Sequence, residues 1–250
     1  MQQEIKAFVF DAYGTLYDVQ SVEQVVEAAF PSYGSLITAI WRIKQLEYTW
    51  LTSLMGRYED FWSLTKRALD YTLRSLHLDA DVQRVEQTAA AYLSLRPYDD
   101  ARDCLERLAP QRLAILSNGS PAMLSNLVKN SSFEGFFDRI LSVDSRRVFK
   151  PAKDAYALVE QELGVSPKEV VFVSSNGFDI CGAKNFGFTV VRVARSTDRF
   201  RDDLPLKVDE RALFDLLRGQ EAETLDQVAD VTVRSLAEIP GLFGDRGRNV

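Results

Sequence analysis

The most distinctive reactive residue in the sequence is Asp11, which directly follows the apolar run 5–10 and precedes Thr15 by four positions. The run predicts a buried parallel strand, and Gly14 predicts a loop after it. Catalytic groups of open α/β sheets gather outside the carboxyl ends of the strands. A carboxylate in that place can attack an electrophile and form a covalent ester. The type and position of Asp11 therefore indicate a nucleophile.

Two residues after Asp11 the chain carries Tyr13. The spacing Asp-x-x-x-Thr resembles the nucleophile loop of the haloacid dehalogenase superfamily, whose phosphatases mostly have a second Asp at that place to protonate the departing alcohol. A tyrosine, with a pKa of about 10, is a poor proton donor at neutral pH. A halide needs no proton, because it leaves as a stable anion. The loop therefore favours carbon–halogen chemistry.

Three further polar clusters follow predicted strands. They are Ser117-Asn118-Gly119, Lys150-Pro151 and the segment 174–179. Each alone is weak evidence, since Ser and Asp are common as helix caps and turn formers. Four such clusters in chain order, counting that of Asp11, are far more specific. We expect the sheet topology to bring them to one crevice.

Alternating strands and helices predict an α/β fold with a Rossmann-like parallel sheet, typical of the same superfamily. Strands are expected at 5–10, 112–117, 139–142, 169–174, 189–194 and 231–233, and helices at 121–129, 153–163 and 178–186. The helical stretch from about 20 to 94 falls between the first two strands and predicts an inserted cap. The core is expected at 1–18 and 96–250 and the cap at 19–95. No detailed assignment is made for 196–226.

The segment 36–55 predicts an unusual helix, because it is apolar nearly all round. Ile37, Ile40, Trp41, Tyr48, Leu51 and Met55 form one stripe, and Leu36, Ile43, Leu46, Trp50 and Leu54 occupy the other sides. Such a helix must be covered on more than one face. Intrachain packing and a second subunit are both possible covers. We expect a homodimer formed through this helix.

Several stretches together resemble one branch of the superfamily, the L-2-haloacid dehalogenases. These stretches are 10–16, Trp41-Arg42, 44–48, 116–119, 147–151, 173–179 and 183–187. The resemblance implies hydrolysis of short L-2-haloalkanoic acids to D-2-hydroxy acids and halide. It implies an aspartyl ester on Asp11, inversion at C2, and no cofactor or metal.

The resemblance also assigns roles to the residues that hold the substrate. Lys150 would keep Asp11 ionised, the effect of an opposite charge close by. Lys150, Ser117 and the main-chain N–H groups of Ala12 and Tyr13 would hold the substrate carboxylate. A second group would receive the halide, and it consists of Arg42, Asn118 and Phe178. In isolation, Arg42 would more readily be a surface ion pair with Glu47 or Asp60.

The remaining assignments concern hydrolysis of the ester and the pocket walls. Asp179 would activate the water, with Asn176 and Ser174 orienting it, while Thr15 and Tyr156 hold Asp11 and its neighbours. An apolar wall for the substrate alkyl chain would come from Tyr13, Leu46 and Phe61. Trp62 is a further candidate for the wall, but we assign it to the packing of the cap.

Composition bounds the other classes. The chain of 250 residues has a net charge of −6 and no basic stripe, which argues against a nucleic-acid partner. No apolar run is long enough for a membrane span, and the N-terminus lacks the pattern of a secretory signal. Two cysteines suit a reducing cytoplasm, and a single histidine, His77, makes a His-based triad hard to build.

Two alternative functions remain at this stage. One is a Mg²⁺-dependent phosphatase of the same fold. Tyr13 counts against it, and so does the run Ser174-Ser175-Asn176, which stands where those relatives have Gly-Asp. The other is a catalytically silent binding protein of this fold. The joint presence of Asp11, Lys150 and Asp179 counts against the second.

Overall fold

A single parallel sheet organises the molecule. The computed structural model describes residues 4–195 and 225–243. Its six strands are β1 (Ala7–Phe10), β2 (Arg112–Ser117), β3 (Arg139–Ser142), β4 (Val170–Ser174), β5 (Thr189–Val193) and β6 (Val231–Val233). They run in the order β3-β2-β1-β4-β5-β6, and each neighbouring pair is parallel. The predicted fold class is confirmed.

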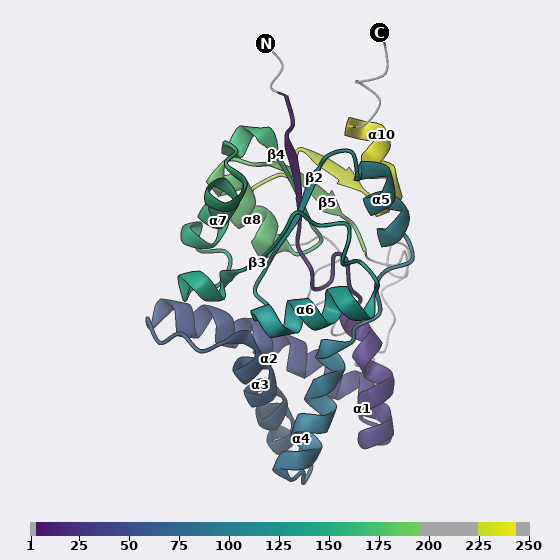
Figure 1. Ribbon diagram of the computed structural model, residues 1–250. Coiled ribbons are helices and arrows are strands. Elements are labelled where there is room, and N and C mark those ends of the chain that lie inside the picture. The colour runs from purple at the N-terminus through teal and green to yellow at the C-terminus, as the bar shows by residue number, and fades with distance from the viewer. Residues whose placement is uncertain (1–3, 196–224, 244–250) are drawn as a thin grey trace.

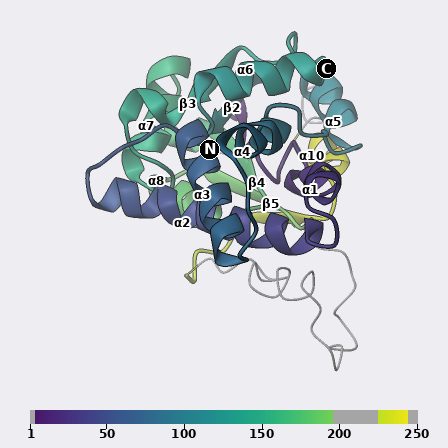
Figure 2. The ribbon, with the colours of Figure 1, turned by 90° about the horizontal axis from the view of Figure 1, so that it is seen from below.

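Helices cover both faces of this sheet, which is why its central strands are almost wholly apolar. Every residue of β1 and β4 is buried. The helices that flank the sheet are α5 (Ala101–Leu108), α6 (Pro121–Asn130), α7 (Lys153–Leu163), α8 (Gly177–Phe186) and α10 (Ile239–Phe243). Seen from below, α7 and α8 lie on one side of the sheet and α5 and α10 on the other (Figure 2).

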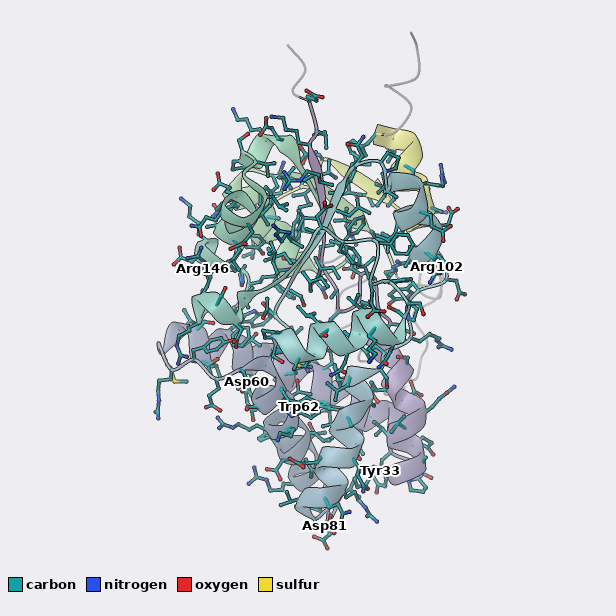
Figure 3. All side chains as sticks on the ribbon, in the orientation of Figure 1. Tyr33, Asp60, Trp62, Asp81, Arg102 and Arg146 are labelled. Carbon is teal, nitrogen blue, oxygen red and sulfur yellow. The ribbon has the colours of Figure 1, made fainter. Side chains whose placement is uncertain are left out.

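A block of helices lies at the carboxyl ends of the strands, below the sheet in Figure 1. It comprises η1 (Val19–Val22), α1 (Glu23–Ala29), α2 (Gly34–Leu54), α3 (Phe61–Ser75), α4 (Val82–Ala89) and η2 (Ala90–Leu93). Carboxylates cap the helices α3 and α4: Asp60 accepts from the N–H groups of Trp62 and Ser63, and Asp81 from that of Arg84. Asp81 marks the end of the block farthest from the sheet (Figure 3).

The two connections between the sheet and this helical block run side by side. The N–H of Tyr98 donates to the carbonyl of Leu16, and the N–H of Asp18 donates to the carbonyl of Arg96. Both ends of the block therefore leave from the place where β1 opens into the loop of Asp11.

The apolar helix α2 is covered along only part of its length. Ile37 and Trp41, in its first half, are fully buried by the rest of the chain. Near its end, Leu54 is 85% exposed, and Met55 just after it is 58% exposed. Intrachain packing thus accounts for the first half of the stripe and leaves the second half open.

The predicted elements agree with the structure to within two residues, with two omissions. Neither α5 nor α10 was predicted from the sequence. The 3₁₀ turns η3 (Val143–Arg146), η4 (Pro167–Glu169) and η5 (Leu236–Glu238) complete the described elements. Most of 196–226 lies outside the described residues. Within those residues, no helix combines the length and apolar character that a membrane crossing requires.

Candidate active site

The strand order changes direction between β1 and β4, and the candidate site lies at the carboxyl ends of these two strands. Ligand sites of open α/β sheets form at such a switch point. The main chain of Asp11 still belongs to the sheet, since its N–H donates to the carbonyl of Val173 at 2.9 Å. The Asp11 side chain is 8% exposed and points out of the strand end into the crevice. The carboxylate is therefore attached directly to the end of the central strand β1.

Three donors fix the carboxylate of Asp11. Its Oδ1 accepts from Nζ of Lys150 at 3.2 Å. Its Oδ2 accepts from Oγ1 of Thr15 at 2.9 Å and from Nδ2 of Asn176 at 2.8 Å. Both oxygens are thus held in one orientation, which is what an in-line attack requires of a nucleophile.

Lys150 links the two buried carboxylates of the site. Its ammonium donates to Asp11, to Oδ2 of Asp179 at 3.0 Å and to the carbonyl of Leu116 at 2.6 Å. The side chain is 1% exposed, so little water screens these interactions. Its three N–H donors are all engaged. A Mg²⁺ ion between Asp11 and Asp179 would have to displace this ammonium, so these residues do not fit a metal there.

Asp179 lies behind the crevice, in the first turn of α8. It is fully buried and also accepts from the phenol of Tyr156 at 2.8 Å. Burial raises the pKa of Asp179 to about 6, and the charge of Lys150 opposes that rise. The phenol reaches Asp179 because residue 182 is a glycine: a Cβ at Gly182 would overlap the ring of Tyr156.

The loop after β1 is tied to the loop after β4. Gly14 takes a left-handed backbone conformation, with φ of 87°, which glycine adopts without strain. The N–H of Ser175 donates to Oγ1 of Thr15, and the hydroxyl of Ser175 donates to the carbonyl of Gly14. The hydroxyl of Ser174 accepts from the N–H of Asn176 and so holds the loop after β4. These hydrogen bonds fix Thr15 and Asn176, the two residues that donate to Oδ2 of Asp11.

A small pocket opens in front of Asp11. It is lined by Asp11, Tyr13, Arg42, Leu46, Phe61, Ser117, Asn118, Lys150, Asn176 and Phe178. All the residues expected to bind substrate are in this set except Ala12, which is fully buried in the loop. Thr15, Tyr156, Ser174 and Asp179 lie behind the pocket wall. Trp62 is not part of the lining, and Figure 3 shows it in the helical block.

Arg42 reaches the pocket from α2. Arg42 is 3% exposed, and its Nη1 donates to Oε1 of Gln45 at 2.6 Å. Gln45 is in turn held by Thr65, to which its amide donates at 2.7 Å. The surface ion pair considered for Arg42 is wrong. Glu47 pairs with Lys44 instead, and Asp60 caps α3.

Two polar atoms at the pocket have no hydrogen-bond partner among the described residues. They are Nε of Arg42 and the phenol oxygen of Tyr13, and both are buried. Burial raises the pKa of Tyr13 well above its usual value, so the phenol stays neutral. A buried cation with an unused N–H, at the same pocket as the carboxylate of Asp11, is suited to receive an anion.

Ser175 and Gln45 were given no role from the sequence. The role of Gln45 could have been predicted, because it follows Arg42 by three positions and residues three apart on a helix lie on the same face. The role of Ser175 could not, since a serine after a strand commonly just forms a turn. Within residues 4–195 and 225–243, no three His, Cys, Asp or Glu side chains come together as a set of metal ligands.

Comparisons with known proteins give the site a context. Residues 5–187 match the family model described as haloacid dehalogenase-like hydrolase. An (S)-2-haloacid dehalogenase of Xanthobacter autotrophicus is 53% identical over 95% of this chain and 94% of its own length. An enzyme of the same name from Pseudomonas putida is 44% identical over 82% and 91%.

The comparison of structures agrees with that of the sequences. The solved L-2-haloacid dehalogenase of Xanthobacter autotrophicus with covalently bound chloropropionic acid superimposes with a TM-score of 0.92 and 51% identity. The match covers 98% of this chain and all of that one.

Proposed function

Because the chain belongs to the haloacid dehalogenase-like hydrolases, we propose that it hydrolyses short L-2-haloalkanoic acids to D-2-hydroxy acids and halide. The observation that carries the proposal is the arrangement of Asp11 and Arg42 at one small pocket. Asp11 supplies a fixed carboxylate, and Arg42 a buried cation with an unused N–H. Tyr13, the residue in the place of a proton donor, has a pKa raised by burial.

In the first step, a carboxylate oxygen of Asp11 attacks C2 of the substrate from the side opposite the halogen. The new C–O bond forms while the carbon–halogen bond breaks, and the electron pair of that bond leaves with the halide. C2 is inverted. Arg42, Asn118 and the edge of the Phe178 ring receive the halide, because a ring edge carries partial positive charge.

In the second step, water attacks the carboxyl carbon of Asp11 in the ester. The ester bond to C2 remains intact until the tetrahedral intermediate collapses, so the hydroxyl oxygen of the product comes from Asp11. Asp179 takes up the proton of the water, with Asn176 and Ser174 orienting the groups around it. On collapse the bond between the carboxyl carbon of Asp11 and the product oxygen breaks, and the departing alkoxide takes the proton back from Asp179. A pKa of about 6 suits Asp179 to act as a base near neutral pH.

Ser117 and the main-chain N–H groups of the Ala12–Tyr13 segment hold the substrate carboxylate. Lys150 contributes mainly its charge, since its N–H donors are already bound to Asp11, Asp179 and Leu116. The apolar walls from Leu46 and Phe61 face the alkyl chain. Helices 19–95 act as a cap over this pocket, because Arg42 comes from α2.

A homodimer formed through α2 is part of the same proposal. Leu51, Leu54 and Met55 expose apolar surface at the end of this helix, and a second copy could bury it symmetrically. A reducing, cytoplasmic location is proposed from the two cysteines, Cys104 and Cys181, which are both free thiols.

Chloride release tests the function. Purified protein is incubated with (S)-2-chloropropionate in the presence of a chelator, and chloride and 2-hydroxypropionate are measured. We expect equal amounts of both, with the R configuration in the product and no reaction with the R substrate. Phosphate release from small esters only with Mg²⁺ would favour a phosphatase, and silence in both assays from folded protein would favour a binding protein.

A further inference from the structure

Outside the pocket, a largely buried arginine holds the back of the nucleophile loop. Nη2 of Arg195, just beyond the end of β5, donates to the main-chain carbonyl of Thr15 at 2.8 Å. The Arg195 side chain is 15% exposed. It touches neither the pocket nor Asp11, and the function proposed above gives it no role.

The other contacts of Arg195 fix it in place. Its Nη1 donates to Oδ2 of Asp100 at 2.8 Å, and its guanidinium carbon lies 3.8 Å from the ring centre of Tyr98. Asp100 also accepts from the hydroxyl of Ser235 at 2.8 Å and from the N–H of Leu236 at 2.9 Å. The planar guanidinium pairs with Asp100 along one edge and stacks on the ring of Tyr98, so few side-chain orientations are open to it.

Thr15 is thus held from two sides. Its carbonyl accepts from Arg195, while its hydroxyl accepts from the N–H of Ser175 and donates to Oδ2 of Asp11. Rotation of the Thr15 peptide would move the hydroxyl away from the reactive carboxylate. A misplacement of about 1 Å in a reacting group can cost on the order of 100-fold in rate.

We propose that Arg195 is a positioning residue for the nucleophile, acting on Asp11 through Thr15. This inference rests on the function proposed above, in which Asp11 attacks C2. Arg195 holds the Thr15 peptide, so that the hydroxyl keeps Asp11 aligned for attack. Its contribution therefore falls on formation of the ester and reaches Asp11 only by way of the Thr15 side chain.

The main variant is Arg195→Gln, assayed for halide release beside the wild type. We expect kcat to fall about 10- to 100-fold, with KM changed by no more than about twofold. Arg107→Gln is the matched control. Like Arg195, Arg107 donates to a main-chain carbonyl, but that carbonyl belongs to Ala237 in η5, at 3.0 Å, and not to Thr15. Arg107→Gln should keep the wild-type kcat.

A double-mutant cycle with Thr15→Val separates positioning from mere support of the fold. Rates are measured in single turnovers with enzyme in excess, so that slow variants remain measurable. In the Thr15→Val background, Arg195→Gln should cost less than about threefold, because the hydroxyl through which Arg195 acts is already gone. Equal losses in both backgrounds would overturn the proposal, as would a wild-type kcat in Arg195→Gln.

Arg195→Lys keeps the proposal testable if the glutamine variant does not fold. Lysine retains the charge beside Asp100, but a single ammonium cannot reproduce the planar fork that spans Asp100 and Thr15. We expect an intermediate kcat from folded Arg195→Lys, and an unchanged kcat would overturn the inference. Failure of the proposed function is a different result, since the wild type itself would then release no halide.

Discussion

The ammonium nitrogen of Lys150 lies 3.2 Å from Oδ1 of Asp11, in a place almost closed to solvent. The same ammonium lies 3.0 Å from Asp179. One buried cation therefore lies between two buried carboxylates, Asp11 as the proposed nucleophile and Asp179 as the proposed base. With both carboxylates ionised, the three groups carry a net negative charge, which suits the role proposed for Asp11.

Removing this cation should damage both stability and catalysis. Lys150→Met leaves two buried carboxylates without their cation, so the free energy of unfolding should fall by about 3–5 kcal/mol. Halide release should be abolished. Urea denaturation and the halide assay measure the two effects. Lys184→Met is the control, because Lys184 forms a more exposed ion pair with Asp230 and should cost no more than about 1 kcal/mol. Equal losses in the two variants would contradict the assigned role of Lys150.

The rate should fall on the acid side as Asp179 is protonated. The base must be ionised, and burial raises the pKa of Asp179 to about 6, so kcat should decline as the pH drops through about 6. Tyr156 lowers this pKa through its hydrogen bond to Asp179. In Tyr156→Phe the acid limb should therefore move to higher pH. A pH–rate profile of both proteins measures the shift, and a limb in the same place would rule out Asp179 as its origin.

The same pKa has an opposite consequence for stability. A carboxyl group whose pKa is raised on folding binds its proton more tightly in the folded protein. Asp179 therefore favours the folded state at low pH, and this contribution is lost as the pH rises from about 4 through about 6. In Asp179→Asn, denaturant unfolding should show a smaller loss of stability over this pH range than in the wild type. An unchanged pH dependence would contradict it.

Gly182 should tolerate no side chain. An added Cβ would overlap the ring of Tyr156, so Gly182→Ala should push the phenol away from Asp179 and destabilise the protein by about 1–3 kcal/mol. Its acid limb should move in the same direction as that of Tyr156→Phe. Gly241→Ala is the control, because nothing lies within 4 Å of its new Cβ. Wild-type stability in Gly182→Ala would show that Tyr156 has room to move.

Gln45 should act through Arg42. Gln45→Met keeps the approximate volume but removes the amide that holds the guanidinium, so Arg42 should lose its fixed orientation toward the halide. We expect kcat/KM to fall about 10-fold and inhibition by added halide to weaken. Lys44→Met, on the same helix but paired with Glu47 at the surface, should leave both quantities unchanged. Halide inhibition as strong as in the wild type would contradict the role of Gln45.

The sequence predicts the sheet well because both of its faces are covered. Central strands such as β1 and β4 then appear as short apolar runs, and the reactive residues follow directly after them. Helix α5 was missed because four of its eight residues are charged, although Cys104, Leu105 and Leu108 bury one face. The helical spacing of these buried residues can be recognised only when the ends of the helix are known.

The pocket residues were predictable for a similar reason, since they belong to short motifs at strand ends and on α2. The supporting contacts were not. Arg195 and Thr15 are 180 positions apart, and no local sequence pattern predicts a hydrogen bond from a side chain to a distant main-chain carbonyl. The exposed end of α2 is a similar case, because an apolar stripe does not tell which chain covers it.

The proposed mechanism requires Asp11 to form a covalent ester with C2 of the substrate. A single turnover in ¹⁸O-labelled water detects this ester, with enzyme in excess over (S)-2-chloropropionate. We expect ¹⁸O in the carboxylate of Asp11, found by mass spectrometry of the peptide, and an unlabelled hydroxyl in the product. Label in the product from this first turnover, with none in Asp11, would show that water attacks C2 directly and that no aspartyl ester forms.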